Sequence, residues 1–142
     1  MLFRSILPSR RSSLLELVIA LDVSGSIDDD ELRDFVAEVD ALKAQIRARI
    51  SLLTCDTELT EGCPWTFEAW EPCQLPCELY GSGGTDFRPV FEWVQAQDGR
   101  PELLVYFTDA AGKFPANEPE YPVLWLVKGE RGVPWGERIA LT

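Results

Sequence analysis

The sequence predicts an α/β fold in which helices flank a mostly parallel central sheet. Short and nearly continuous apolar runs recur along the chain, as is typical of strands that are buried on both faces of a sheet. Segments with a helical period separate several of these runs, and this alternation favours a parallel sheet with right-handed crossovers. We therefore expect a Rossmann-like arrangement that carries a β-hairpin insertion.

The first half of the chain provides two strands and a helix. Leu14–Leu21 is the first apolar run. A helix should span residues 28–47, because apolar side chains recur there at steps of three and four. They are Leu32, Phe35, Val36, Val39, Leu42 and Ile46. Acidic residues open this helix and Lys43 lies near its end, which suits the helix dipole. Ile50–Cys55 is the second predicted strand.

The second half begins with an irregular region. Residues 56–80 have no helical period, and prolines interrupt their short apolar pieces, which indicates a hairpin and a loop. The glycine-rich residues 81–84 predict a hinge. A second helix is expected over residues 86–97. Three further runs complete the predicted strands, at Leu103–Thr108, Val123–Val127 and Arg138–Leu141.

Length and charge limit the organisation and the partners. A chain of 142 residues suits one domain. We assign residues 14–142 to it and the polar, basic residues 1–13 to a flexible arm. The net charge of −11 disfavours a nucleic-acid partner. No apolar run approaches the ~20 residues of a membrane helix. The N-terminus does not fit a signal peptide, so the default expectation is a cytoplasmic protein without a membrane partner.

The chain contains no histidine. This absence excludes Ser-His-Asp and Cys-His catalysis, together with zinc sites that are built on imidazole. The chemistry of the chain must therefore depend on other side chains.

Polar clusters stand beside the predicted strands and helices at three places. Asp22, Ser24 and Ser26 follow the first strand, Thr85 precedes the second helix, and Asp109 follows the third strand. Ligands bind such sheets at the carboxyl ends of the strands, where these clusters should meet. All five side chains offer oxygen, which hard cations prefer. The sequence therefore predicts a site for Mg²⁺, or for Mn²⁺ or Ca²⁺.

At these residues the sequence resembles the von Willebrand factor A (VWA) domains. Their metal-ion-dependent adhesion site (MIDAS) has the same order of ligands as Asp22-x-Ser24-x-Ser26, Thr85 and Asp109. The sequence is most similar to the VWA-like domain at the C-terminus of bacterial metallopeptidase-like proteins. The segments 83–91 and 121–125 carry this likeness. The resemblance covers about residues 15–142 and implies the Rossmann-like VWA fold.

The resemblance also implies a function. Ser24, Ser26 and Thr85 would bind the metal directly, and Asp22 and Asp109 mostly through water. Such a site accepts an Asp or Glu from a protein partner. Relatives of this kind work beside MoxR-type AAA+ ATPases, which makes such an ATPase an expected partner. The metallopeptidase-like half is absent here, so we expect no enzymatic activity. The family usually has glycine where this chain has Ala110.

Each candidate ligand also has a simpler interpretation. Ser26 and Asp29 fit a capping box, Thr85 fits the cap of the second helix, and Asp109 fits a turn at the end of a strand. No Gly-Lys-Ser or Gly-Lys-Thr follows the glycines at 81–84, so this segment is not a phosphate-binding P-loop. The joint pattern at three loops favours the metal site.

Two alternative functions stay open. One is a Mg²⁺-dependent hydrolase or phosphotransferase with Asp22 as nucleophile, although Ser24 stands where a dehalogenase-type enzyme has aspartate. The other is a scaffold stabilised by zinc. Cys63, Cys73 and Cys77 lie in the irregular region, and Cys73 and Cys77 have a spacing that zinc sites use. A fourth ligand such as Cys55 would complete the site, and a disulfide is the other interpretation.

Overall fold

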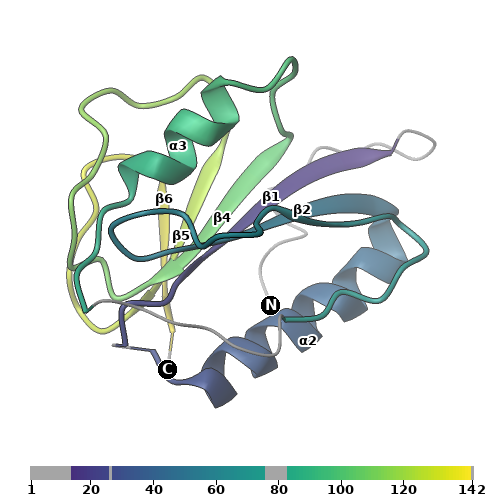
Figure 1. The fold of residues 1–142 in the computed structure, drawn as a ribbon, viewed down its shortest axis with the longest axis horizontal. Helices are drawn as coiled ribbons and strands as arrows, with labels where there is room; N and C mark the ends of the chain where they lie inside the picture. The colour runs from purple at the N-terminus through teal and green to yellow at the C-terminus, as the bar shows by residue number, and fades with distance from the viewer. Residues whose placement is uncertain (1–13, 26, 76–82, 142) are drawn as a thin grey trace.

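A computed structural model describes residues 14–25, 27–75 and 83–141. Within these residues a twisted six-stranded sheet runs through the molecule, and Figure 1 shows helices on its two faces. The helices are α2 (Asp29–Ile46) and α3 (Arg88–Gln95). The strands are β1 (Leu15–Asp22), β2 (Ala48–Cys55), β3 (Trp65–Phe67), β4 (Leu103–Thr108), β5 (Val123–Lys128) and β6 (Glu137–Leu141).

The strand order confirms the predicted α/β fold. The order is β3-β2-β1-β4-β5-β6, and every neighbouring pair is parallel except β2 and β3. From β1 the chain first builds β2 on one side and later returns to place β4 on the other side. The strand order therefore reverses at β1. Parallel sheets of this kind bind ligands at the carboxyl edge beside such a reversal.

The insertion after β2 contains the predicted hairpin. β3 pairs with β2 in the antiparallel sense, and an isolated bridge joins Cys55 to Leu59. The residues 76–80 of the predicted loop and the arm at 1–13 lie outside the described residues. In the part of the chain that the structure describes, no helix is long and apolar enough to cross a membrane.

The second helix is shorter than its periodicity predicts. It begins at Arg88, whereas the sequence placed its start at Asp86. The backbone of the residues before it is used elsewhere. The Asp86 amide donates to the Asp56 carbonyl at 2.8 Å, and the Phe87 amide donates to the Lys113 carbonyl at 2.9 Å. These bonds join the approach to α3 to two other loops.

Two apolar cores explain why the strands read as continuous apolar runs. Alternate residues of each strand face opposite sides of the sheet. On one side, α2 covers Leu17 and Ile19 with the face that contains Phe35. On the other side, α3 covers an aromatic cluster in which the rings of Tyr106 and Trp125 stack at 5.2 Å. Both faces of the sheet are therefore covered by apolar contacts.

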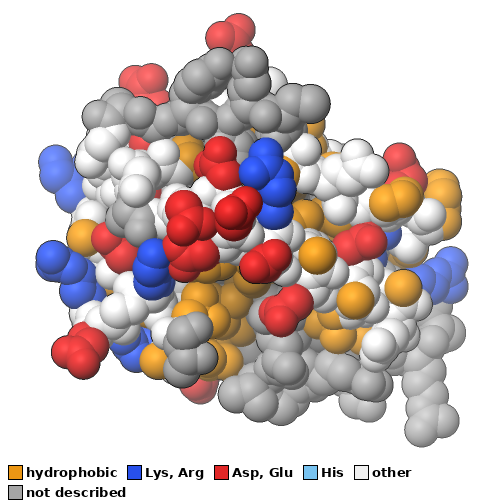
Figure 2. Space-filling view, turned by 90° about the horizontal axis from the view of Figure 1, so that it is seen from below, with side chains coloured by type: hydrophobic (Ala, Val, Ile, Leu, Met, Phe, Trp, Pro, Cys, Tyr) orange, Lys and Arg blue, Asp and Glu red, His pale blue; other side chains and the backbone are white. Residues whose placement is uncertain are grey.

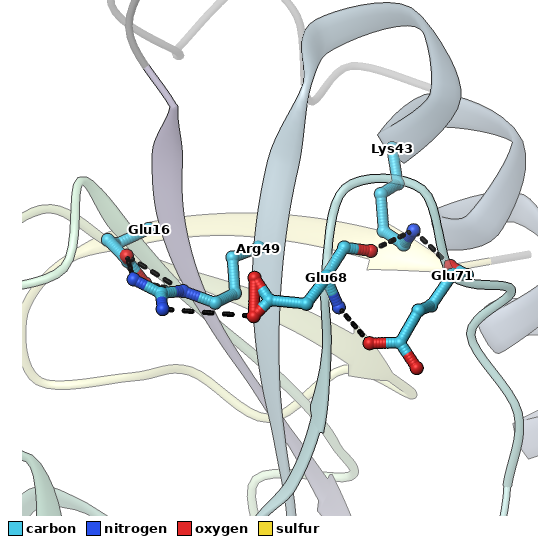
Figure 3. Close-up of polar contacts among 5 residues, drawn as sticks. All are labelled: Glu16, Lys43, Arg49, Glu68 and Glu71. Carbon is cyan, nitrogen blue, oxygen red and sulfur yellow. Dashed lines mark hydrogen bonds and ion pairs between the residues drawn. The ribbon is translucent and has the colours of Figure 1, made fainter.

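A buried lysine fixes the loop that follows β3. Lys43 on α2 is only 2% exposed, and its ammonium donates to three backbone carbonyls, those of Glu68 (2.7 Å), Ala69 (3.1 Å) and Glu71. Figure 3 shows this contact beside Arg49, which lies between Glu68 and a carboxylate on β1. Position 43 lies four residues after Val39 on the apolar stripe of α2, but the sequence gave no sign of the acceptors that its ammonium contacts.

Candidate metal centre

Three loops meet at the carboxyl edge of the central strands. The first follows β1 and contains Ser24, the second contains Thr85, and the third follows β4 and contains Asp109. β1 and β4 are neighbours, so the first and third loops leave the sheet side by side. This is the edge at which the sequence predicted the metal ligands.

Asp22 is the buried centre of this arrangement. It ends β1 with 0% exposure. Its Oδ1 accepts hydrogen bonds from the Ser24 amide at 2.9 Å and from the Ser24 hydroxyl at 2.5 Å. Its Oδ2 accepts one from the Thr108 hydroxyl at 2.6 Å. Both oxygens are thus engaged, and the carboxylate orients one hydroxyl in the loop after β1 and one at the end of β4.

Thr108 also belongs to this arrangement, although the sequence analysis did not assign it to the site. Its hydroxyl donates to Asp22 and accepts a hydrogen bond from the Ala110 amide at 3.1 Å. It therefore holds the end of β1 to the turn that follows β4. The available signal was a hydroxyl residue at the carboxyl end of a buried strand, directly before Asp109.

The Thr85 loop packs directly against the loop that follows β4. Asp86 and Lys113 form an isolated parallel bridge. Gly112 lies so close that a Cβ there would meet Thr85 Cγ2 at 2.7 Å and the Thr85 carbonyl oxygen at 2.9 Å. This close approach brings the second and third polar clusters together, as the sequence predicted.

Substitution of Gly112 by alanine should disturb this contact. The added methyl group meets backbone as well as side chain, so we expect a loss of about 1–3 kcal/mol in the free energy of unfolding. Urea denaturation would measure it. Gly99→Ala is the matched control, because a Cβ at Gly99 meets nothing within 4 Å. Equal stability of the two variants would show that the loops are not tightly packed.

Asp109 lies in a tight turn. Its Oδ1 accepts a hydrogen bond from the Ala111 amide at 3.0 Å. Ala110 between them has a φ of 66°, in the left-handed region that favours glycine. The related domains usually have glycine at this position. Ala110 therefore departs from that pattern without preventing the turn that positions Asp109.

The two helix caps proposed as alternatives are wrong. α2 is capped by Asp28, whose Oδ1 accepts a hydrogen bond from the Glu31 amide at 2.8 Å, while the Asp28 amide donates to Glu31 Oε1 at 3.4 Å. α3 has Phe87 at its N-cap and no side-chain cap, so Thr85 does not cap it. Ser26 lies outside the described residues. The helices therefore have no need of Thr85 or Ser26 as caps.

Two ion pairs lie next to the candidate centre. The Lys128 ammonium contacts Glu31 at 2.6 Å. This hydrogen bond raises the pKa of Lys128, and the charges of Asp28 and Asp109 raise it further. Hydrogen bonds from Arg88 hold the pKa of Asp86 below its ordinary value. The edge thus contains several acidic groups, two of them already paired with cations.

The residues fit a hard cation. In the described residues, no lysine or arginine pairs with the buried Asp22, and no three His, Cys, Asp or Glu side chains form a metal cluster. The available donors are instead carboxylates and hydroxyls, in Asp22, Ser24, Thr85 and Asp109. Oxygen sets of this kind suit Mg²⁺, which keeps several waters. A cation would compensate the charge of Asp22.

The described cysteines do not form one cluster. Cys73 packs into the core on the α2 side of the sheet, and Cys63 packs against the core on the α3 side. Burial raises the pKa of the Cys73 thiol to about 12. Cys77 lies outside the described residues. This placement disfavours a zinc ion shared by Cys63 and Cys73.

Comparison with known proteins agrees with the fold. A solved aerotolerance-related membrane protein from Bacteroides fragilis superimposes with a TM-score of 0.52 at 15% identity, over 80% of this chain and 67% of that chain. An uncharacterized protein of Thermotoga maritima is 29% identical over 104 residues, which are 72% of this chain. Those residues are 25% of the Thermotoga protein, so the match spans only a quarter of its length.

The family assignment comes from a sequence profile. The profile of the VWA-like domain (DUF2201) matches residues 17–142. This range contains both helices and all six strands, apart from the first two residues of β1. The match includes the three loops at the carboxyl edge. The chain therefore belongs to the VWA-like domain family.

Proposed function

We propose that this domain is a metal-dependent protein-binding module with a MIDAS-type site. The observation that carries the proposal is the buried carboxylate of Asp22, which orients the hydroxyls of Ser24 and Thr108 and forms no ion pair within the described residues. A buried charge without a compensating partner is costly. A divalent cation in front of these groups would compensate it.

The proposed roles follow from the resemblance to MIDAS sites. Ser24, Ser26 and Thr85 would bind Mg²⁺, Mn²⁺ or Ca²⁺ directly, and Asp22 and Asp109 would hold its water ligands. With neutral direct ligands, the bound cation supplies an electrophilic position for one further carboxylate. We propose that a protein partner offers an Asp or Glu to that position.

The hydrolase or phosphotransferase alternative has less support. A nucleophilic aspartate needs a carboxylate oxygen that can reach the substrate. Both oxygens of Asp22 instead accept hydrogen bonds from neighbouring loops, and its side chain is fully buried. These contacts suit a residue that positions ligands better than one that attacks a substrate.

The proposal extends to a specific class of protein partner. We propose a MoxR-type AAA+ ATPase as a candidate partner, since related domains work beside such enzymes. Membership of the VWA-like family supports an interaction role in general. The negative charge of the chain favours a basic face on any partner that is held by charge as well as by the metal.

Removal of the metal should release the partner. Protein captured on the immobilised domain in Mg²⁺ is expected to elute with a chelator at moderate salt. Thr85→Ala should retain less than a tenth of it, whereas Thr66→Ala, exposed on β3, should bind as the wild type does. Calorimetry with the purified partner would quantify both effects. Equal affinity in Mg²⁺ and in chelator would contradict metal-dependent binding.

A further inference from the structure

A second concave site lies on the α3 side of the sheet. It is a pocket of about 480 Å³ between α3 and residues 115–121. That volume lies within the range of ligand sites in proteins. α3 follows Thr85 along the chain and residues 115–121 follow Asp109, so the walls of the pocket continue from two of the loops of the candidate metal centre.

Aromatic side chains contribute to the lining of this pocket. Phe91 and Tyr121 belong to it and are 8% and 7% exposed. Because both side chains are almost entirely buried, they form an apolar wall of the pocket. Burial raises the pKa of Tyr121 to about 12, so its hydroxyl stays neutral. Within the described residues this hydroxyl forms no hydrogen bond, so its oxygen can accept one from a donor that enters the pocket.

The charged side chains of the pocket are predominantly acidic. Glu92, Glu118 and Glu120 all line it. Two guanidinium groups also line it, but that of Arg88 is held by Asp86, with Nε to Oδ1 at 2.9 Å and Nη2 to Oδ2 at 2.7 Å.

Arg100 is the other guanidinium, and it lies near enough to Tyr121 for its charge to affect that residue. Three carboxylates thus line the pocket together with one guanidinium that is not paired with Asp86. The local charge is negative, and a cationic group would be the complementary occupant.

We propose that this pocket binds an arginine side chain of a protein partner. The aliphatic stem would pack on Phe91 and Tyr121, and the guanidinium would donate to the glutamates and to the tyrosine hydroxyl. Arginine fits better than lysine because its planar group donates to carboxylates in a fork and stacks on aromatic rings. This inference does not depend on the metal centre, because none of the candidate metal ligands that the structure describes lines the pocket.

The probe is Nα-acetyl-arginine amide, and its neutral isostere Nα-acetyl-citrulline amide is the control. Amide chemical shifts of the isotope-labelled domain are followed during titration in the presence of chelator. We expect saturable shifts centred on residues 88–95 and 115–121, with the citrulline compound at least tenfold weaker. Equal binding of the two compounds, stronger binding of the lysine analogue, or no saturable binding would overturn the proposal.

Two triple variants separate a local site from diffuse charge. Glu92→Gln/Glu118→Gln/Glu120→Gln removes the acidic side chains of the pocket. Asp29→Asn/Asp34→Asn/Glu38→Gln removes the same charge from the exposed face of α2, where Figure 2 shows acidic side chains gathered over the N-terminal half of the helix.

We expect at least a tenfold loss of affinity for the arginine compound in the first variant and less than a twofold loss in the second. Similar losses in both variants would show that the attraction is not specific to the pocket, and would contradict the proposal. Because chelator is present throughout, the arginine titration does not test metal binding. A negative result in one experiment therefore does not contradict the other proposal.

Discussion

Replacement of Asp22 by asparagine should make the metal-free domain more stable and abolish its stabilisation by magnesium. The buried carboxylate accepts three hydrogen bonds but forms no ion pair among the described residues, so its charge is poorly compensated without a cation. Asparagine keeps the shape and removes the charge. Its Nδ2 cannot accept a hydrogen bond, so the Thr108 hydroxyl must turn and accept one from it. We expect a gain of about 1 kcal/mol without metal.

The effect should reverse when magnesium is added. A cation that binds only the folded wild type at a hundred times its dissociation constant adds about 2.7 kcal/mol of stability. Asp22→Asn should receive none of this, so the wild type becomes the more stable protein. Urea denaturation in chelator and in Mg²⁺ measures both values. Asp34→Asn, on the exposed face of α2, should respond to Mg²⁺ as the wild type does. An equal magnesium effect in Asp22→Asn would exclude Asp22 from the site.

Lys43→Met should lower the free energy of unfolding by about 3 kcal/mol. Methionine nearly preserves the volume of the side chain but cannot donate to the carbonyls of Glu68, Ala69 and Glu71. Hydrogen bonds from a charged donor contribute more than neutral ones, and buried acceptors that lose their donor are costly. The loop after β3 should become the first part of the domain to exchange its amide hydrogens.

Arg33→Met provides the control for Lys43→Met. Arg33 is exposed on the same helix, so its replacement removes the same charge while burying nothing. We expect it to change stability by less than about 0.5 kcal/mol. Thermal or urea unfolding compares the two variants. A loss below about 1 kcal/mol in Lys43→Met would mean that water replaces the ammonium without cost, and that the loop does not depend on this contact.

The parts of the fold that the sequence predicted depend on periodicity. Strands buried on both faces give continuous apolar runs, and the run predicted at Leu103–Thr108 coincides with β4. α2 differs from its predicted span by one residue at each end, because its apolar stripe is regular. The meeting of the polar loops could be predicted because the carboxyl ends of parallel strands lie at one edge of the sheet. That edge is where such sheets bind ligands.

Other features depend on tertiary contacts that a periodic pattern does not contain. α3 begins two residues later than predicted because the amides of Asp86 and Phe87 donate hydrogen bonds to other loops. Thr108 acquired its role only through the pairing of β4 with β1. Position 43 continues the apolar stripe of α2, but the acceptors of the Lys43 ammonium come from a loop distant in sequence. Cys63 and Cys73 pack on opposite faces of the sheet, and the sequence does not indicate on which face each cysteine lies.

Calorimetric titration of Mg²⁺ into the purified domain tests the central claim most directly. The account predicts that one Mg²⁺ binds per wild-type chain and that Ser24→Ala/Thr85→Ala shows no binding while remaining folded. Thr66→Ala should titrate as the wild type does. Magnesium binding of unchanged affinity in the double variant would place the metal away from the loops that follow β1 and precede α3, and would contradict the account.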